Sequence, residues 1–113
     1  MSSPITTHIL DTHLGIPAQD VSIELFRKEE DGYTLLAQGR TDDDGRIRDL
    51  LPEGSLSSGV YQMRFAVEEY HQRNGIEGFY PEAVITFIVR NVDQHYHIPL
   101  LLSPFAYSTY RGS

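Results

Sequence analysis

The sequence is organised as short runs in which apolar and polar residues alternate, and each run ends at turn-forming residues. The alternation is clearest at residues 21–26 and 60–67, where every second side chain is apolar. A repeat of two is the spacing at which the side chains of a β-strand return to the same face. Residues 68–74 are the one helical candidate, and Gly75 follows at a typical C-terminal position. The pattern predicts an all-β fold, an antiparallel β-sandwich with one short helix.

Turn residues divide the chain into about eight expected strands. Their ranges are 5–11, 21–26, 33–41, a short strand that starts at Arg46, 60–67, 83–89, 95–103 and 105–111. The run Asp42-Asp43-Asp44-Gly45 predicts a tight turn before the short strand, because Asp and Gly tolerate a left-handed backbone. The 83–89 run is apolar on both faces, so we expect both faces to be covered, by the helix or by a second subunit.

Composition limits the classes of function. The chain has 113 residues, of which 40% are hydrophobic and 22% charged, and this predicts a single globular domain over residues 1–113. It has no cysteine, which excludes disulfides, thiolate catalysis and thiolate metal ligands. The formal net charge of -7 argues against nucleic acid and anionic membranes as partners. Because the sequence shows neither a secretory signal nor a transmembrane run, the expected location is the cytoplasm.

Three histidines are predicted to point away from the core. In the segment 95–102 the even-numbered residues are apolar and face the core, whereas His95 and His97 point to the other side. In the first strand the odd-numbered residues form the better core face, which turns His8 outward. These side chains could be solvated surface groups, or the three imidazoles of a catalytic zinc site. Against zinc, side chains two residues apart on a strand lie roughly 7 Å apart, and no other metal-binding motif is near.

Arg46 follows Gly45 at the exit of the acidic turn, where its side chain can be held rigidly. It could stabilise a developing negative charge, or it could form an ordinary surface ion pair with the three aspartates of the turn. The other two histidines offer less. His13 is predicted to lie in a loop, and His71 to be an ordinary surface residue of the short helix.

Several motifs resemble those of the transthyretin-like family. They are Thr7-His8-Ile9-Leu10-Asp11 with Gly15-Ile16-Pro17-Ala18, then Gly39 to Arg46, then His95 to Pro104 followed by Phe105 to Thr109, and finally Tyr110-Arg111-Gly112-Ser113. The terminal tetrapeptide is typical of the 5-hydroxyisourate hydrolases, the enzyme branch of this family. The hormone-carrying transthyretins lack it and replace the matched histidines and arginine. The resemblance extends from about Thr6 to the end of the chain.

The resemblance implies a fold, an assembly and a reaction. The fold is two four-stranded sheets with a short helix, in a homotetramer (a dimer of dimers) whose sites lie where the dimers meet. The reaction is the hydrolytic ring opening of 5-hydroxyisourate to 2-oxo-4-hydroxy-4-carboxy-5-ureidoimidazoline in urate degradation, without a metal or organic cofactor. The implied catalytic residues are His8, Arg46, His97 and Ser113, and the implied substrate-binding residues are His8, Arg46, Ser108, Tyr110 and Arg111.

The residue types suit that reaction. Histidine, with an unperturbed pKa of about 6.5, can take a proton from water near neutral pH, and a fixed arginine can stabilise charge on the attacked carbonyl. The sequence does not decide which histidine is the base. Two other functions stay open, a small-molecule carrier that uses the same channel without catalysis and a sandwich without a ligand, because a fold alone does not fix a function.

Two interpretations are open for the last four residues, 110–113. Chain termini are commonly frayed and tolerant of change, so residues 110–113 could be a dispensable tail. The opposite expectation is that Gly112 lets the backbone turn sharply and brings the hydroxyl of Ser113 and the terminal carboxylate toward the site.

Overall fold

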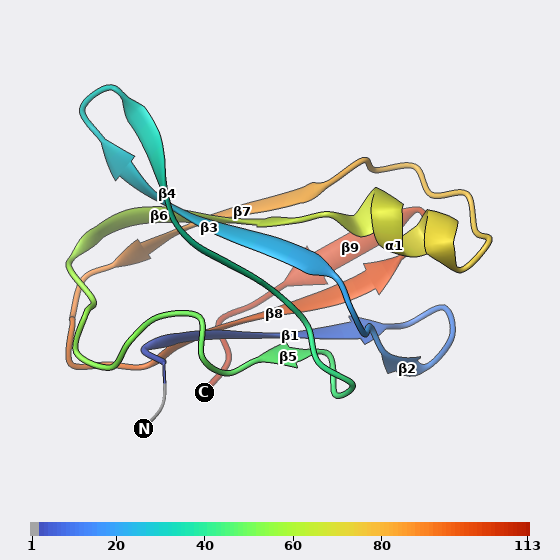
Figure 1. Ribbon diagram of the computed structural model, residues 1–113, viewed down its shortest axis with the longest axis horizontal. Coiled ribbons are helices and arrows are strands. Elements are labelled where there is room, and N and C mark those ends of the chain that lie inside the picture. Colours follow the sequence, from blue (N-terminus) through green and yellow to red (C-terminus); the bar gives the residue numbers. More distant parts are fainter. Residues whose placement is uncertain (1–2) are drawn as a thin grey trace.

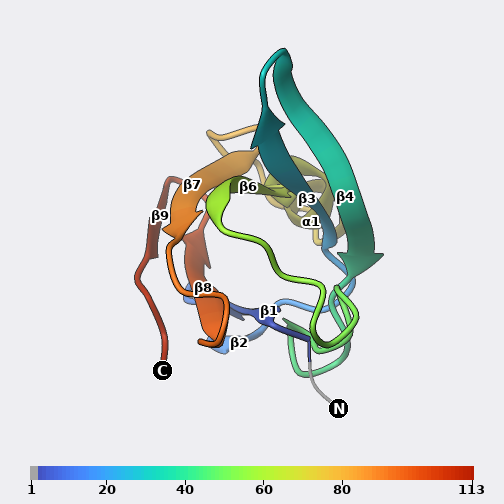
Figure 2. The ribbon, with the colours of Figure 1, turned by 90° about the vertical axis from the view of Figure 1, so that its left-hand side faces the viewer.

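The computed structural model describes residues 3–113, and its two facing sheets confirm the β-sandwich (Figure 1). The elements are β1 (Ile5–Asp11), β2 (Ile16–Pro17), β3 (Ser22–Glu29), β4 (Gly32–Arg40), β5 (Arg46–Ile47), β6 (Gly59–Phe65), α1 (Val67–Arg73), β7 (Ala83–Val89), β8 (Tyr96–Ser103) and β9 (Ala106–Thr109). Figure 2 views the sandwich from its end and separates the two layers. Within residues 3–113, no helix is long and apolar enough to cross a membrane.

The strand order explains how the sandwich is built. One sheet, here the β1/β8 sheet, has the order β2-β1-β8-β9 with β5 also paired to β1, and the other, the β3/β6 sheet, has the order β4-β3-β6-β7. The β1/β8 sheet has five strands rather than the implied four, because two strands of two residues each, β2 and β5, both pair with β1. The pairing of β1 with β8 is parallel, and the other pairs between these strands are antiparallel. Strand β1 is therefore central, with neighbours on both sides.

The core lies between the sheets and follows the period of two that the sequence predicts. Ile5 and Ile9 of β1 are fully buried, and the same holds for Met63 and Phe65 of β6 and for Leu100 of β8. Burying an aliphatic or aromatic side chain of this size contributes about 1.5–3 kcal/mol relative to leaving it exposed. Because these residues point inward, the residues between them point outward, and this fixes the face on which the even-numbered side chains of β1 lie.

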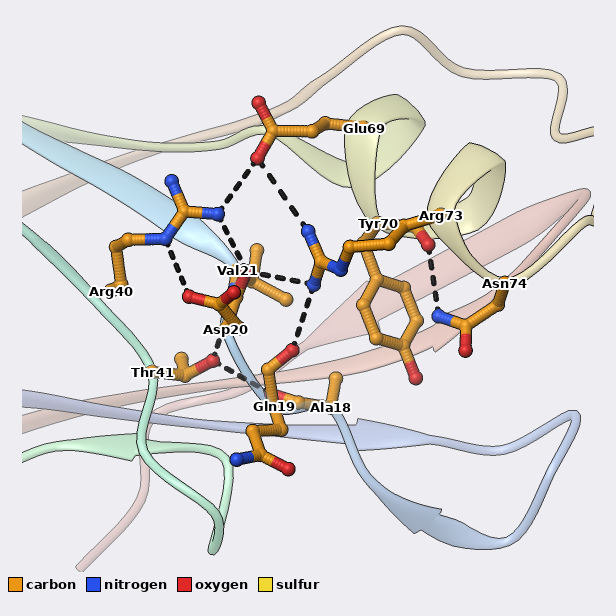
Figure 3. Close-up of polar contacts among 10 residues, drawn as sticks. All are labelled: Ala18, Gln19, Asp20, Val21, Arg40, Thr41, Glu69, Tyr70, Arg73 and Asn74. Carbon is orange, nitrogen blue, oxygen red and sulfur yellow. Dashed lines mark hydrogen bonds and ion pairs between the residues drawn. The ribbon is translucent and has the colours of Figure 1, made fainter.

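Helix α1 is fastened to the sandwich by polar contacts as well as by packing. The hydroxyl of Tyr70 donates a buried hydrogen bond of 2.7 Å to Oδ2 of Asp11, and burial together with this contact raises the pKa of Tyr70. At the solvent side, Arg40 donates to Oδ1 of Asp20 at 2.6 Å and to Oε1 of Glu69 at 2.9 Å (Figure 3). These contacts link the helix to both β1 and the β3–β4 hairpin.

The prediction that His71 is a surface residue is wrong. Val67, Tyr70 and His71 form the buried stripe of α1, the i, i+3, i+4 spacing by which a helix packs on a core. The ring of His71 is 1% exposed and packs against Gly78, where an added Cβ would lie 2.8 Å from its Cδ2. Val67, expected to end a strand, instead begins this helix, because β6 stops at Phe65.

The outward face of β7 is not covered by any part of residues 3–113. Its Val84 and Ile88 are 37% and 43% exposed, so the short helix does not provide the cover that the two-sided apolar run predicts.

Candidate active site

Three of the predicted catalytic side chains lie on neighbouring strands, on the face of the β1/β8 sheet that points away from the core. His8 of β1 stands directly opposite Arg46 of β5, and His97 of β8 stands opposite Thr6, two residues before His8. Residues directly opposite each other, and residues two apart on one strand, share a face. Arg46, His8 and His97 therefore form a contiguous group, here the outward cluster, and each of the three is half-buried.

The acidic turn holds the backbone of Arg46 in place. Gly45 has a φ of +75° in the left-handed region, as the sequence predicts for this turn. An added Cβ at Gly45 would lie 2.5 Å from the carbonyl oxygen of Ile9, so no larger residue fits here. The Oδ1 of Asp42 accepts hydrogen bonds from the backbone N–H groups of Asp44 and Arg46, at 2.9 and 3.0 Å. The turn thus fastens the start of β5 to β1.

The alternative of a surface ion pair between this turn and Arg46 is not found within residues 3–113. The aspartates interact instead with Arg48, whose guanidinium lies 3.9 Å from Oδ2 of Asp42 and 3.5 Å from Oδ2 of Asp44. Arg46 stands opposite His8 within β5, whereas Arg48 lies beyond the end of β5, and Oδ1 of Asp42 already accepts hydrogen bonds from the backbone. Arg46 is left with a positive charge that no carboxylate of the described residues neutralises by direct contact.

The positive charge of Arg46 acts on both histidines. Desolvation by burial, followed by Arg46, lowers the pKa of His8 below its ordinary value of 6.5, against smaller raising effects that include Asp44 and Asp42. Desolvation also lowers the pKa of His97, and Arg46, His8 and His95 act in the same direction. Both rings are thus neutral at neutral pH, and a neutral imidazole is the form that can accept a proton.

Thr6 is a site residue that the analysis of the sequence missed. Its hydroxyl lies 2.8 Å from Nδ1 of His97 and 2.9 Å from Nε2 of His95, so it connects the two outward histidines of β8. Alternation places Thr6 on the same face as His8, and that signal was available. What the sequence could not supply was the parallel register that sets Thr6 opposite His97.

The C-terminal tail, residues 110–113, lies against His97. The backbone N–H of Gly112 donates to the carbonyl of His97 at 2.9 Å, in an antiparallel bridge, and Figure 2 shows the tail running down beside β8. An added Cβ at Gly112 would lie 2.5 Å from Cδ2 of the His97 ring. Its φ is not in the left-handed region, so the close approach to this ring is the reason for glycine. This bridge positions Ser113, the last residue, immediately after the partner of His97.

The predicted substrate-binding residues of the last strand are divided between two places. Ser108 stands opposite Leu101, whose neighbours along β8 point inward, so Ser108 lies on the outward face. Tyr110 is 60% exposed. The choice of Ser108 over Tyr107 for this face agrees with the register, because the ring of Tyr107 packs inward against Tyr80.

Arg111 lies at the open edge between the sheets. Its guanidinium is 4.5 Å from the centre of the Tyr96 ring, and it donates to Oε1 of Gln94 at 3.0 Å. A cavity of about 460 Å³ opens beside it, and His97 and Tyr110 also line this cavity. His97 therefore belongs both to the outward cluster and to the cavity that the tail borders.

The geometry does not support the zinc alternative. Within residues 3–113, one group of three ligating side chains, Asp42, Asp43 and Asp44, has its ligand atoms within 4.8 Å of one another. The histidines are not such a group, because the hydroxyl of Thr6 stands between the rings of His95 and His97. A set of exposed acidic side chains is by itself only a solvated turn.

Residues 5–112 match the HIUase/Transthyretin family. The chain belongs to this family. Among its relatives, proteins named 5-hydroxyisourate hydrolase are 45% identical in Halalkalibacterium halodurans, with all of both chains covered, and 42% identical in Mus musculus, with 99% of this chain and 97% of the relative covered. A protein of the same name in Salmonella typhi is 42% identical over 99% of this chain and 82% of its own length.

Solved structures of the family confirm the fold. The crystal structure of sea bream transthyretin in complex with thyroxine superimposes with a TM-score of 0.92 at 35% identity, covering 97% of this chain and 95% of that one. The fold is thus shared between proteins named as enzymes and a protein that binds a small molecule. The fold therefore does not decide between these functions, and the side chains of the site must do so.

Proposed function

We propose that this chain is a hydrolase that opens the ring of 5-hydroxyisourate to give 2-oxo-4-hydroxy-4-carboxy-5-ureidoimidazoline. The observation that carries the proposal is the outward cluster of Arg46, His8 and His97, with the C-terminal tail bridged to His97. Relatives that cover nearly the whole chain are named 5-hydroxyisourate hydrolase. A solvated surface would not need a glycine at which the chain end can approach a histidine ring so closely.

The mechanism follows from the charges. A neutral imidazole of the cluster takes a proton from water, and the water oxygen bonds to a ring carbonyl carbon of the substrate. Negative charge then develops on the carbonyl oxygen, and Arg46, which no described carboxylate neutralises, is available to stabilise it. The adjacent ring C–N bond breaks as the carbonyl re-forms, and the proton passes to the leaving nitrogen. Because the bond that breaks lies in a ring, one molecule results, and its two new groups, a carboxylate and a ureido group, are those of the proposed product.

The remaining residues bind and orient the substrate in this proposal. Ser108 supplies a hydroxyl on the outward face, and Tyr110 and Arg111 supply a flat ring and a donor fork at the cavity that His97 also lines. Ser113 follows Gly112, so its hydroxyl and the terminal carboxylate are placed next to the partner of His97. No metal or organic cofactor takes part, and a rate that chelators do not change is the expected result.

The proposed active form is a homotetramer. The outward cluster lies beside apolar surface, since Leu10 is 36% exposed and Leu101 is half-buried, and the outer face of β7 is also uncovered. An open face leaves the reacting groups in water, whereas a second subunit set against it excludes water and strengthens the electrostatic effects. Light scattering at micromolar concentration tests this, and a monomer contradicts it.

Location in the cytoplasm stays a prediction from the sequence, which cell fractionation tests.

A carrier function is the second candidate, because a structure of the same family binds thyroxine. The two functions differ in a simple assay. Freshly generated 5-hydroxyisourate decays spontaneously, and its ultraviolet absorbance is followed with and without the purified protein. We expect the decay to accelerate in proportion to protein concentration and beyond one substrate per chain. An unchanged decay rate with the tetramer intact favours the carrier.

A further inference from the structure

The hydroxyl of Thr6 is placed between two imidazole nitrogens. It lies 2.8 Å from Nδ1 of His97 and 2.9 Å from Nε2 of His95, both within hydrogen-bond distance. A threonine hydroxyl has one proton to donate and lone pairs with which to accept. With both rings neutral, both bonds form only if one ring donates to the hydroxyl and the other accepts from it. The position of the proton on His97 is therefore tied to that on His95 through Thr6.

Two arrangements satisfy both bonds. In the first, Nδ1–H of His97 donates to Thr6, the hydroxyl donates to Nε2 of His95, and Nε2 of His97 keeps a free lone pair. In the second, Nε2–H of His95 donates to Thr6, the hydroxyl donates to Nδ1 of His97, and Nε2 of His97 carries a proton. Only the first leaves His97 able to accept a proton at Nε2, because its Nδ1 is turned toward Thr6.

The surroundings of His97 favour the first arrangement. Nδ1 is the ring nitrogen that faces Thr6, and the backbone of Thr6 acts to raise the pKa of the ring, as a hydrogen-bond acceptor does, which favours an N–H at Nδ1. Gly112 packs against Cδ2 on the opposite edge of the ring. The ring is thus held at both edges, and no hydrogen bond within residues 3–113 engages its Nε2. The charged or titratable groups that act on it are Arg46, His8 and His95.

We propose that Thr6 is a positioning residue that holds His97 as the Nδ1–H tautomer, with the hydroxyl proton directed to His95, so that Nε2 of His97 is the base that deprotonates the attacking water. This inference rests on the proposed hydrolase function and deepens it. It names one of the two histidines as the base, and it gives His95 a role as the acceptor that orients the hydroxyl. In the step itself, the proton leaves the water oxygen for Nε2 while that oxygen bonds to the carbonyl carbon.

The tautomer can be observed without any assay of activity. Long-range ¹H–¹⁵N spectra of the ¹⁵N-histidine-labelled tetramer, recorded above the titration range, distinguish a protonated ring nitrogen from an unprotonated one. We assign the His97 signals by their loss in the His97→Asn variant. The expected result is a protonated Nδ1 and an unprotonated Nε2 at His97, and likewise at His95, whose Nε2 accepts from the hydroxyl of Thr6. A protonated Nε2 at His97 overturns the proposal even if the protein is an active hydrolase.

Two variants sharpen the spectroscopic test. Thr6→Val has the same shape and removes the hydroxyl, so we expect His97 to become a mixture of tautomers. His95→Ala removes the acceptor, which frees the hydroxyl to donate to Nδ1 of His97, so we expect a fraction of the Nε2–H form to appear. If His97 keeps one tautomer in Thr6→Val, Thr6 does not set it and the proposal is wrong.

The kinetic test separates positioning from structure. In Thr6→Val we expect kcat to fall by a factor of about 10 to 100, the usual effect of losing a residue that orients a reacting group, with KM little changed. Thr6→Ser keeps the hydroxyl and should retain most of the activity. The matched control is Thr34→Val, an exposed threonine of β4 in the other sheet, which should equal the parent. A loss of kcat in Thr6→Ser as large as in Thr6→Val contradicts the proposal, because the hydroxyl would then not be the relevant group.

The outcomes also separate this inference from the function on which it rests. If 5-hydroxyisourate decays no faster with the protein while His97 shows the predicted tautomer, the proposed function is wrong and the structural inference stands. If the protein is active and Thr6→Val has a full kcat, the function stands and the role of Thr6 is wrong.

Discussion

The arginines on the outward faces of the two sheets differ in whether a carboxylate neutralises them. On the β3/β6 sheet, Arg64 lies 2.8 Å from Glu24 and 3.5 Å from Glu82, in a group of exposed ion pairs. On the β1/β8 sheet, Arg46 has no ion pair within residues 3–113 and instead lowers the pKa of two histidines. Both faces arise from the same alternation of side chains along strands, so the fold alone does not explain the difference.

The different surroundings of Arg46 and Arg64 indicate which outward face carries a functional site. An exposed ion pair such as that of Arg64 contributes roughly 0–1 kcal/mol and marks a solvated surface. In the outward cluster, Arg46 faces two histidines without a carboxylate, so it forms no ion pair that would stabilise the fold and instead opposes protonation of the histidines. Perturbed pKa values of this origin gather at functional sites. We therefore expect the outward cluster of the β1/β8 sheet to carry the chemistry, whereas the ion pairs of Arg64 mark a solvated part of the β3/β6 sheet.

The largest expected effect comes from removing the tail, which only the β1/β8 face possesses. Deletion of residues 110–113 should abolish hydrolysis, because it removes the bridge to His97 and three proposed site residues, Tyr110, Arg111 and Ser113. The tetramer and the thermal unfolding midpoint should be preserved, since β9 ends at Thr109. Turnover, light scattering and a thermal melt measure this. A truncated tetramer with undiminished turnover would show that the tail is dispensable and would favour the carrier.

Single substitutions in the outward cluster come next. His8→Ala, Arg46→Ala and His97→Ala should each lower kcat by a factor of about 10² to 10⁴, the usual cost of losing a proton-transfer or oxyanion-stabilising group. The far-ultraviolet circular dichroism should not change. The matched control is Arg64→Ala, which removes an arginine from the other outward face and should leave turnover unchanged. If kcat fell equally in Arg64→Ala and Arg46→Ala, the two outward faces would not differ in function and the comparison would be wrong.

The pH dependence is a subtler test. If a neutral histidine is the base, activity is lost as that histidine is protonated, so the acid limb of kcat/KM should have its midpoint below 6.5. Replacing Arg46 by Gln removes one cause of the lowered pKa values, so the midpoint should move up toward 6.5. Desolvation, the larger cause, remains, and the move should be partial. A midpoint that stays in place or falls in Arg46→Gln contradicts the electrostatic role of Arg46.

The same lowered pKa values predict the pH dependence of stability. The unfolded chain, whose histidines have their ordinary pKa, binds protons more readily than the folded chain. The free energy of unfolding should thus be highest above pH 6.5 and fall as the pH drops through that value toward the lowered folded pKa. Denaturant unfolding at several pH values measures this dependence. The change of the free energy of unfolding with pH should be smaller in the His8→Ala and His97→Ala variants.

The smallest expected effect on activity is at His71, a histidine that is buried rather than outward. Neither ring nitrogen has a hydrogen-bond partner within residues 3–113, so His71→Phe should be neutral or stabilising, because it removes buried polar atoms without partners. His71→Ala should cost roughly 2–4 kcal/mol by leaving a cavity. Both variants should keep their turnover at a temperature where they are folded. A loss of turnover in His71→Phe would place this histidine in the site.

The period of two allowed the core and the outward position of His8 and His97 to be predicted from the sequence, since both depend only on local alternation. Three features could not be predicted from this period, because they depend on contacts between segments that are distant in the sequence. The parallel register places Thr6 opposite His97. The packing of α1 buries His71. The approach of the tail to His97, rather than a turn, requires Gly112.

The sequence also could not predict that Arg46 lacks an ion pair with the aspartates of the turn. Three consecutive aspartates next to an arginine favour an ion pair, yet the turn uses Asp42 to accept backbone N–H groups and leaves the carboxylates to Arg48. Which of the two arginines reaches the aspartates depends on where β5 ends, because Arg46 lies in β5 opposite His8 and Arg48 lies beyond it. That is a property of the folded turn.

The central claim is that the outward cluster of the β1/β8 sheet carries out hydrolysis and does not merely bind. The most direct measurement uses 5-hydroxyisourate in large molar excess over the tetramer and follows the ring-opened product over time, for the parent and for His97→Asn. The parent should form many equivalents of product per chain faster than the spontaneous reaction, and His97→Asn should approach the spontaneous rate. Product formation at the spontaneous rate in both, with at most one substrate retained per chain, would contradict the claim.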